Sequence, residues 1–374
     1  MNQEHLKKIT TLRHQLHAHP ELSMQEKETK TRLMAFLKEN TKLELVDCGY
    51  WFYACYHCGR KSAEKIAFRA DFDALPMEES IALSYASQNP GVSHKCGHDG
   101  HSAALAGMAL ELDEKGAGKD IYLIFQHGEE IGGGGEECAR LIKEKGISQV
   151  YAFHNTSGYP EGSIILRKGT AQCASKGLTV CFQGVPSHAS HPEEGRNPAQ
   201  AVSKLALAIE KAVETTIEDR KIVLGTIVQI AVGSKNFGIS ASYGEISVTL
   251  RAERAQDMVH LEQQIRKAAE ELARADDLTL SFEERDIFPD TVNDSACVEA
   301  VRRAAKESGF PVIDMPQPFR ASEDFGYYLK QCPGAIFYIG NGEDYAPIHT
   351  SGFDFNDMLL ETAVTMFWKL AGEA

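Results

Sequence analysis

The sequence predicts an α/β protein of two domains: a larger α/β domain with a mixed, largely parallel sheet, and a smaller ferredoxin-like α+β domain inserted into it. Three observations lead to this prediction. A chain of 374 residues that is 43% hydrophobic and 25% charged is large enough to bury more than one core. Short apolar runs alternate with helical stretches over residues 1–172 and again over 288–374, as in largely parallel sheets. Residues 173–287 instead have the order β-α-β-β-α-β of a ferredoxin-like module.

The larger domain is expected to begin with two helices, followed by short strands. Apolar residues recur at three- and four-residue steps from Leu6 to Leu16, which predicts an amphipathic helix that ends before Pro20. A second helix is expected over residues 25–38. Short apolar runs predict strands at residues 43–46, 51–56, 66–68, 121–125, 150–153 and 335–339.

The inserted domain shows its different pattern from about Cys173. Alternation predicts a strand at residues 178–182, and an alanine-rich stretch predicts a helix at 197–214. The remaining elements are two strands, a helix and a last strand, expected at residues 222–230, 245–251, 258–275 and 278–282.

Charge and apolar patterning exclude several functions. The chain has 39 basic and 53 acidic residues, and its net charge of -14 argues against nucleic acid and anionic membranes as partners. Residues 1–8 lack the apolar core of a signal peptide, and no apolar run approaches the ~18 residues that span a bilayer. We therefore expect a cytoplasmic protein. Nine scattered cysteines, an odd count, argue against a disulfide framework, and the Cys55-Cys58 pair is interpreted as structural.

The feature that points to chemistry is the cluster Cys96-Gly97-His98-Asp99-Gly100-His101. A thiolate, imidazoles and a carboxylate are ligands that suit zinc and its first-row neighbours. Glycines let the backbone fold tightly, so that Cys96 and His98 can point at one centre. The alternative is a structural turn, but four metal-capable side chains within six residues favour a metal site.

Further candidate side chains follow the predicted strands of the larger domain. Asp71 and Asp73 come after one strand, Glu129-Glu130 after the next, and His154 after a third. The carboxyl ends of strands in open α/β sheets are where ligands collect, so we expect these groups at one edge. Adjacent carboxylates repel unless a cation lies nearby, and one of the two glutamates can bind metal while the other reaches a water.

Simpler interpretations exist for each of these residues. Glu129-Glu130 alone is a common solvated pair, and the glycines at 132–135 could form a phosphate cradle, although no Gly-Lys-Ser/Thr follows them. A lone histidine such as His154 or His349 is more often a hydrogen-bonded structural residue. His188 and His191, in the inserted domain, could form a second metal site or polarise a substrate, and their spacing does not choose between the two.

In its motifs, the chain resembles the zinc-dependent aminoacylase and carboxypeptidase family, in particular the amidohydrolase branch of N-acyl-amino-acid, hippurate and indole-acetyl-amino-acid hydrolases. The matching segments occur in the family's order along the whole chain. They are Arg13-His14-Gln15-Leu16-His17-Ala18-His19-Pro20-Glu21-Leu22, Arg69-Ala70-Asp71-Phe72-Asp73-Ala74-Leu75-Pro76, the 96–101 cluster, Glu129-Glu130, His154-Asn155, Ser187-His188-Ala189 and His349.

This resemblance implies a set of roles. Two divalent metal ions would be held by five ligands: Cys96, His98, Glu130, His154 and His349. Glu129 would be the general base, and Asp73 would orient a ligand from behind. Asp99 and His101 are left with supporting roles. The thiolate favours zinc, with manganese, cobalt and nickel as alternatives.

The resemblance also gives roles to the inserted domain, which would act as a lid and dimerisation domain. His188 would stabilise the oxyanion, from the same chain or from the partner subunit of a homodimer. Asn236 and Arg251 would bind the substrate carboxylate, a task that suits the arginine fork. This chain departs from the family's Asn-x-Ile-Pro with Asn236-Phe237-Gly238-Ile239, and it has Pro192-Glu193 where the branch often has Pro-His.

The function implied is hydrolysis of the amide bond of N-acyl amino acids, most simply N-acetyl amino acids, to a carboxylic acid and a free amino acid. A dipeptidase or exopeptidase of the same family is an alternative that differs only in the leaving group. A metal-binding protein without catalysis is disfavoured, because a base and an oxyanion residue accompany the ligands.

Overall fold

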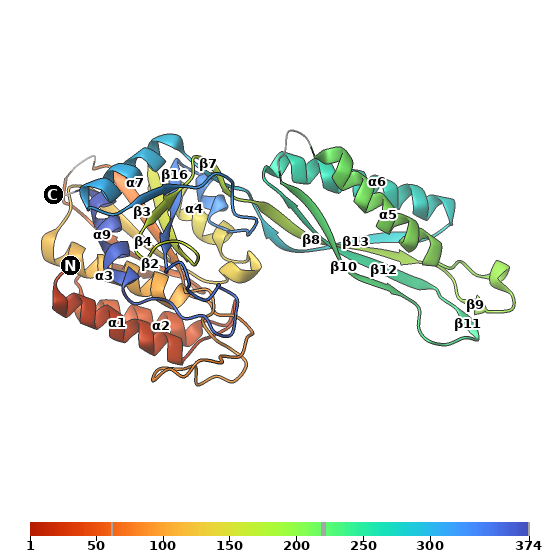
Figure 1. The fold of residues 1–374 in the computed structure, drawn as a ribbon, viewed down its shortest axis with the longest axis horizontal. Coiled ribbons are helices and arrows are strands. Elements are labelled where there is room, and N and C mark those ends of the chain that lie inside the picture. The colour runs from red at the N-terminus through yellow and green to blue at the C-terminus, as the bar shows by residue number, and fades with distance from the viewer. Residues whose placement is uncertain (61–62, 218–221, 373–374) are drawn as a thin grey trace. The chain divides into compact units, whose positions relative to one another are not determined.

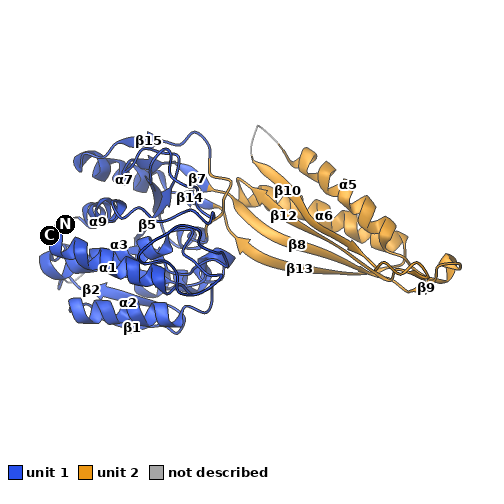
Figure 2. Cartoon of the chain, turned by 60° about the horizontal axis from the view of Figure 1, so that its bottom comes forward, with its two compact units in different colours: residues 1–171, 291–317, 324–374 blue, residues 172–290, 318–323 orange. Residues whose placement is uncertain are grey.

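The computed structural model describes residues 1–60, 63–217 and 222–372. The chain forms two compact units, drawn in different colours in Figure 2. Unit 1 contains residues 1–171, 291–317 and 324–374, and unit 2 contains residues 172–290 and 318–323. Residues 318–323 were expected in the larger domain, but they join unit 2, where Phe319 bridges to Gln172 and the carbonyl of Ala321 accepts the N–H of Cys173. Of the predicted ranges, residues 61–62, 218–221 and 373–374 lie outside the described part of the chain.

Unit 1 is built on an eight-stranded mixed sheet of order β1-β2-β4-β3-β5-β16-β6-β15 (Figure 1). Its centre is parallel: β3 pairs in parallel with β4 and β5, and β16 with β5. The strands are β1 (Glu44–Asp47), β2 (Phe52–Tyr56), β3 (Lys65–Asp71), β4 (Asp120–Gln126), β5 (Gln149–Thr156), β6 (Ile164–Leu166), β15 (Val312–Asp314) and β16 (Gly334–Gly340). Because the central strands are buried on both faces, they are almost continuously apolar.

Helices cover this sheet. The helices α1, α3, α9 and α7 pack side by side in that order, and α4 packs against α8. Their bounds are α1 (Gln3–Ala18), α2 (Lys27–Asn40), α3 (His98–Lys115), α4 (Gly135–Lys145), α7 (Ser295–Glu307), α8 (Gly326–Leu329) and α9 (Leu359–Ala371). A short two-stranded sheet joins β7 (Gly169–Gln172) to β14 (Thr291–Asn293). Helices α1 and α2 confirm the two helices predicted at the start of the chain.

Helix α3 is the main element that was not predicted from the sequence. Residues His98 to Leu112 are all buried, so this helix lacks the one-sided apolar periodicity of a surface helix. Gly97 precedes it with a φ of 108°, and a Cβ there would lie 2.2 Å from Oδ1 of Asn155. The expected tight turn is therefore confined to Gly97, and the rest of the cluster forms the first turn of a buried helix.

Unit 2 has the ferredoxin-like order. It contains β8 (Ala174–Gln183), α5 (Ala199–Thr216), β10 (Val223–Val232), β12 (Tyr243–Ala252), α6 (Ala255–Ala275) and β13 (Thr279–Phe288). Its four strands form an antiparallel sheet of order β10-β12-β8-β13. The core of unit 2 joins the apolar sides of α5 and α6, including Leu205 and Leu261, to the sheet. The two sheets together confirm the predicted fold class.

Four short elements complete the described part of the chain. Strands β9 (Ser187–His188) and β11 (Ile239–Ser240) pair as a small extension of unit 2, next to the 3-10 helix η2 (Pro192–Glu194). The 3-10 helix η1 (Glu129–Ile131) follows β4 in unit 1.

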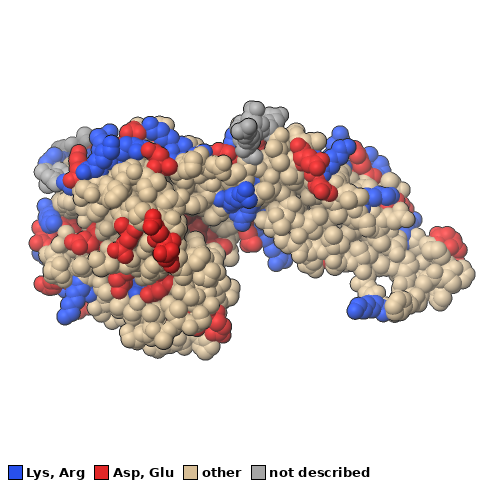
Figure 3. Space-filling model, in the orientation of Figure 1, with Lys and Arg blue, Asp and Glu red and all other residues tan. Residues whose placement is uncertain are grey.

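Basic and acidic side chains lie interspersed on the face of the molecule drawn in Figure 3. Within the described residues, no helix combines the length and apolarity needed to cross a bilayer.

Candidate metal centre

The predicted ligands of unit 1 meet at the carboxyl edge of the parallel strands. Asp71 ends β3, opposite Gln126 at the end of β4, and the chain then enters η1 with Glu129 and Glu130. His154 lies near the end of β5, which pairs with the other side of β3. Since parallel strands end at the same edge, residues far apart in sequence converge there.

Five side chains surround one point. The Sγ atom of Cys96 lies 3.4 Å from Nε2 of His154 and 3.3 Å from Nε2 of His349. Oε1 of Glu130 lies 3.5 Å from Nε2 of His349 and 3.8 Å from Nε2 of His98. Two groups, Cys96-His98-His154 and Cys96-Glu130-His349, each keep their ligand atoms within 4.8 Å of one another. The two groups share Cys96, and together they would provide ligands for two divalent metal ions.

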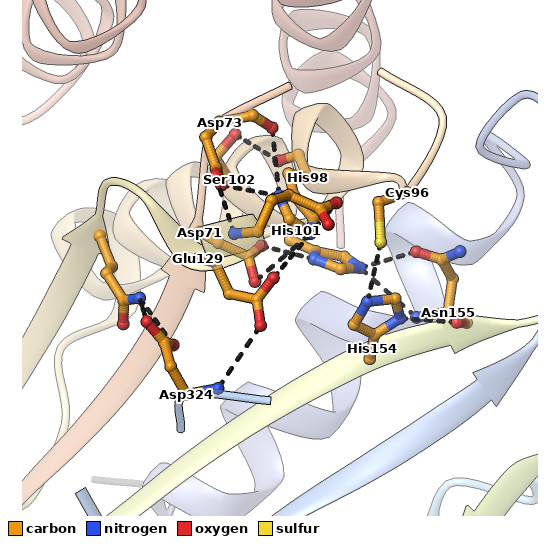
Figure 4. A network of polar contacts seen from close by, with 12 residues as sticks. Asp71, Asp73, Cys96, His98, His101, Ser102, Glu129, His154, Asn155 and Asp324 are labelled. Carbon is orange, nitrogen blue, oxygen red and sulfur yellow. Dashed lines mark hydrogen bonds and ion pairs between the residues drawn. The ribbon is translucent and has the colours of Figure 1, made fainter. Parts of the chain in front are cut away.

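Two histidines of the centre, His98 and His154, turn Nε2 inward and hydrogen-bond the protein through Nδ1. Nδ1 of His98 lies 3.0 Å from Oδ1 of Asp73, and Nδ1 of His154 lies 2.7 Å from the carbonyl of Asn155 (Figure 4). Each acceptor makes Nδ1 the protonated nitrogen of a neutral ring and leaves Nε2 with a lone pair. This is how proteins orient metal-binding histidines.

Two inward atoms lack partners that a cation would supply. Within the described part of the chain, Nε2 of His98 and Oε1 of Glu130 are buried without a hydrogen-bond partner. Buried polar atoms are rarely left so, and each exception calls for an explanation. A thiol, two carboxylate oxygens and imidazole nitrogens are a donor set that fits zinc or another first-row dication.

The pKa shifts of the predicted ligands also indicate that a cation belongs in this centre. Burial, together with the nearby carboxylates of Glu130 and Glu129, raises the pKa of the Cys96 thiol well above its usual range. Burial opposes a charge on His98, but Asp71 and Asp73 outweigh it and raise the pKa of His98 to about 10. Burial also lowers the pKa of His154 well below its usual range, which keeps that ring neutral. A bound cation would reverse the first two effects, because it stabilises the thiolate and replaces the proton on His98.

Glu129 lies beside the ligands and is itself buried, with 6% of its surface exposed. Oε2 of Glu129 lies 3.9 Å from Nε2 of His98, and Oε1 accepts the N–H of Asp324 at 3.4 Å (Figure 4). Its carboxylate therefore faces the same centre as the ligands and is held from the other side by a backbone group.

Asp73 connects three parts of the centre. Oδ1 faces His98, while Oδ2 accepts the backbone N–H of Glu130 at 3.0 Å and the hydroxyl of Ser23 at 2.7 Å. One buried carboxylate thus fixes the ring of one predicted ligand and the backbone of another, which supports the orienting role expected for it.

Residues behind the centre were identified only in part from the sequence. His101 lies 2.6 Å from Oδ1 of Asp71, and Arg69 joins Asp71 to Asp324 at 2.6 and 2.7 Å. Asp324, which the sequence analysis does not identify, also accepts the N–H of Gly135 at 2.8 Å. Its only signal in the sequence is an acidic pair before an aromatic stretch, a pattern that exposed helix starts share.

Unit 2 carries the other three predicted residues, at its two ends. His188 in β9 pairs with Ile239 in β11. The carbonyl of Gly238 accepts the N–H of Ala189. The N–H of Gly238 donates to Oδ1 of Asn236. These elements continue from the end of β12 where Tyr243 pairs with Gln183. Arg251 lies near the other end of β12, where its Nη1 donates to the carbonyl of Arg320 and to Oγ of Ser322.

The distance between these ends follows from the strand. Tyr243 and Arg251 are eight residues apart in one strand, which corresponds to roughly 26 Å at the usual rise per residue. Unit 2 therefore brings His188 and Asn236 together and separates both from Arg251.

His188 has a defined proton arrangement. It is exposed, and its Nδ1 accepts the backbone N–H of Ser190 at 3.2 Å and faces Oγ of Ser190 at 2.7 Å. A ring that accepts at Nδ1 carries its proton on Nε2 when neutral. His188 can thus donate a hydrogen bond from Nε2 to a developing negative charge.

The chain is similar to a known enzyme family. A model of the peptidase family M20/M25/M40 matches residues 67–372. N-acetyl-L-cysteine deacetylase of Bacillus subtilis is 32% identical over 343 residues, which are 91% of this chain and 82% of that protein. Hippurate hydrolase of Campylobacter jejuni is 29% identical over 364 residues, 96% of this chain and 94% of the hydrolase.

A solved structure has the same fold. The Bacillus subtilis YXEP protein, described as a dinuclear metal binding peptidase from the M20 family, superposes with a TM-score of 0.81 at 26% identity. The match covers 99% of this chain and 98% of that one.

Proposed function

The chain belongs to the peptidase family M20/M25/M40, and we propose that it is a metal-dependent amidohydrolase that cleaves N-acyl amino acids to a carboxylic acid and a free amino acid. The observation that carries the proposal is the pair of ligand groups that share Cys96, with the carboxylate of Glu129 beside them. Relatives named as N-acetylcysteine deacetylase, hippurate hydrolase and N-acetyldiaminopimelate deacetylase share the substrate class.

The metal ions would be held by Cys96, His98, Glu130, His154 and His349. Zinc is the preferred ion because of the thiolate, and manganese, cobalt or nickel would suit the same donors. The dinuclear metal site named for the related Bacillus subtilis structure supports two divalent ions here. When bound, two such cations polarise a carbonyl and lower the pKa of a water.

The protein residues would then move protons and hold charge. Glu129 takes a proton from the attacking water, and the oxygen of that water forms a bond to the amide carbon. Nε2 of His188 donates to the oxygen on which negative charge develops. Glu129 returns the proton to the leaving nitrogen as the carbon–nitrogen bond breaks. Asp73 keeps His98 and the backbone of Glu130 in place throughout.

A homodimer would explain the arrangement of unit 2. The roughly 26 Å between the two ends of β12 exceeds the length of an N-acyl amino acid, so His188 and Arg251 of one chain cannot both contact one substrate. They can meet at one substrate if they come from two chains. Arg251 would then bind the carboxylate in one site, while His188 and Asn236 would serve the site of the partner subunit.

The edge of unit 2 offers a surface for that dimer. Strand β10 ends the sheet order, and its side chains Val228 and Ile230 are 63% and 53% exposed. Apolar side chains on an open edge strand favour pairing with a second copy.

A substrate screen on metal-reconstituted protein tests the proposal. The chelated protein should be inactive, and zinc, manganese or cobalt should restore cleavage of N-acetyl or benzoyl amino acids, detected as free amine. Preference for unblocked dipeptides would indicate the dipeptidase alternative. Tight metal binding without cleavage of any amide in the panel would contradict the proposal and leave a non-catalytic metal protein.

A further inference from the structure

Lys95 is a fully buried lysine directly before Cys96, with 0% of its surface exposed. Its Nζ atom forms an ion pair with Glu79 and donates to the carbonyl of Phe353 at 2.7 Å. A buried ammonium is costly unless it is paired and hydrogen-bonded, so these contacts define one position for it. Neither Lys95 nor Glu79 has a role in the proposed chemistry.

Glu79 is itself held in place by two other groups. Its Oε1 lies 2.9 Å from Nε2 of His17, and its Oε2 accepts the N–H of Ser87 at 2.8 Å. Nδ1 of His17 lies 2.8 Å from Oδ2 of Asp99, in the first turn of α3. The ammonium of Lys95 is therefore anchored to the same helix that carries His98.

The backbone of Lys95 holds a second segment of the centre. Its carbonyl accepts the N–H of His349 at 2.7 Å. His349 has a φ of 59°, which is disfavoured for a residue other than glycine, and its side chain is 48% exposed. Packing therefore contributes little to its position, and the hydrogen bond to Lys95 is a main restraint.

The two contacts of Lys95 bracket one loop. The carbonyl binds the start of residues 349–353 and the ammonium binds their end, while residues 350 and 351 between them are exposed. The loop and the Cys96 segment are more than 250 residues apart in sequence, yet one residue, Lys95, holds both ends of the loop next to Cys96.

We propose that Lys95 is a positioning residue that sets the place of His349 relative to Cys96, and so controls the affinity of the metal ion that these two residues share with Glu130. The inference rests on the ligand roles in the proposed function. It predicts that loss of the ammonium loosens the 349–353 loop and weakens one metal site of the two. The group Cys96-His98-His154 does not use this loop and would keep its ion.

The test uses Lys95→Met, which keeps the chain length and the backbone carbonyl but removes the charge. Lys115→Met is the matched control, because Lys115 pairs with Glu111 on α3 and does not contact the loop. Zinc binding is measured by competition with a chromogenic chelator. In Lys95→Met we expect one dissociation constant to rise about 10- to 100-fold and the other to stay within error, with Lys115→Met unchanged.

Two further readouts separate positioning from a general loss of structure. Excess zinc should restore the kcat of Lys95→Met with KM unchanged. Cobalt-loaded Lys95→Met should keep a thiolate-to-metal absorption, because Cys96 also belongs to the group Cys96-His98-His154, which does not use the loop. Equal weakening of both sites, or two unchanged constants, would overturn the proposal.

A second variant covers the case in which Lys95→Met does not fold. Glu79→Gln removes the counter-ion but leaves the lysine, and the same criterion of one weakened site decides the question. Wild-type protein that binds two zinc ions but cleaves no N-acyl amino acid would refute the proposed function alone, because the metal measurements need no substrate.

Discussion

The metal centre of unit 1 and the β9–β11 extension of unit 2 both carry predicted functional residues, but they hold them in opposite ways. In the centre, His98 and Glu130 are restrained by Asp73, and no part of that carboxylate is left without a contact. In the extension, His188 and Asn236 are exposed, and the hydrogen bonds of their side chains are made to residues two positions away, Ser190 and Gly238. The centre is preorganised by its own unit, whereas the extension presents its groups to something outside it.

Exposed apolar side chains in the extension also indicate that another molecule covers it. Phe237 is 96% exposed, and Ile239, which pairs with His188, is 57% exposed. Large apolar groups gathered at an exposed tip mark a surface that another molecule covers. A partner subunit with its substrate would cover it in the proposed dimer. The contrast therefore predicts that changes in the centre act within one chain and changes in the extension act between chains.

Glu129→Gln is expected to have the largest effect. The amide keeps the size of the side chain and can still accept the N–H of Asp324, but it cannot take a proton from water. We expect kcat to fall about 10⁴-fold, at the upper end for loss of a general base. Metal content, measured by atomic emission, should stay at the wild-type value because Glu129 is outside the proposed ligand set.

The two measurements together identify the role. Loss of metal along with activity would make Glu129 a ligand, and retained turnover would exclude it as the base. Glu137→Gln, on the exposed side of α4, is a suitable control for the removal of a carboxylate from the same segment.

His188→Ala is expected to lower kcat about 10²- to 10³-fold, the range seen when one oxyanion donor is removed. The zinc affinity should not change, since His188 belongs to unit 2. Mixing this variant with Glu129→Gln tests the contrast between the two regions. If the extension serves the partner subunit, each mixed dimer contains one complete site, and random mixing should restore roughly a quarter of wild-type activity.

One result of the mixing experiment would contradict action between chains. If the two inactive variants stay inactive after subunit exchange, confirmed by mass spectrometry of differently labelled chains, His188 acts within its own chain. Near-normal turnover of His188→Ala alone would remove the residue from the mechanism.

The sequence predicted the residues of the centre better than their surroundings. Cys96, His98 and His154 carry local signals, either a glycine-rich cluster or a place at a strand end, and the structure brings them together with Glu130 and His349. Helix α3 lacked a signal because it is buried on all sides, and amphipathic periodicity appears only when one face meets water.

Contacts between distant segments were beyond sequence reasoning for a different reason. Lys95 and Asp324 look like ordinary surface charges in the sequence, yet both are buried at junctions of loops that tertiary structure alone brings together. The separation of Arg251 from Asn236 is likewise a matter of strand length and register. Motif order places residues in one family site without saying which chain of a dimer provides them.

The smallest expected effect is a change in how the free energy of unfolding depends on pH. It arises from the buried charged residues around His17 in unit 1. Burial opposes a charge on His17, but hydrogen bonds to Asp99 and Glu79 outweigh it and raise the pKa of His17 to about 9, from 6.5 in the unfolded chain. A raised histidine pKa stabilises the fold fully below pH 6.5, and that contribution is lost as the pH rises through 9. The shift corresponds to at most about 3 kcal/mol.

The free energy of unfolding of the metal-free protein should therefore fall more steeply between pH 6.5 and 9.5 in the wild type than in His17→Gln. Urea unfolding followed by tryptophan fluorescence reports on the right unit, because both tryptophans, Trp51 and Trp368, lie in unit 1. An unchanged slope in His17→Gln would mean that His17 is not charged in the folded protein. Asp99 and Glu79 would then be neutralised by Arg13 and Lys95, with which they form ion pairs.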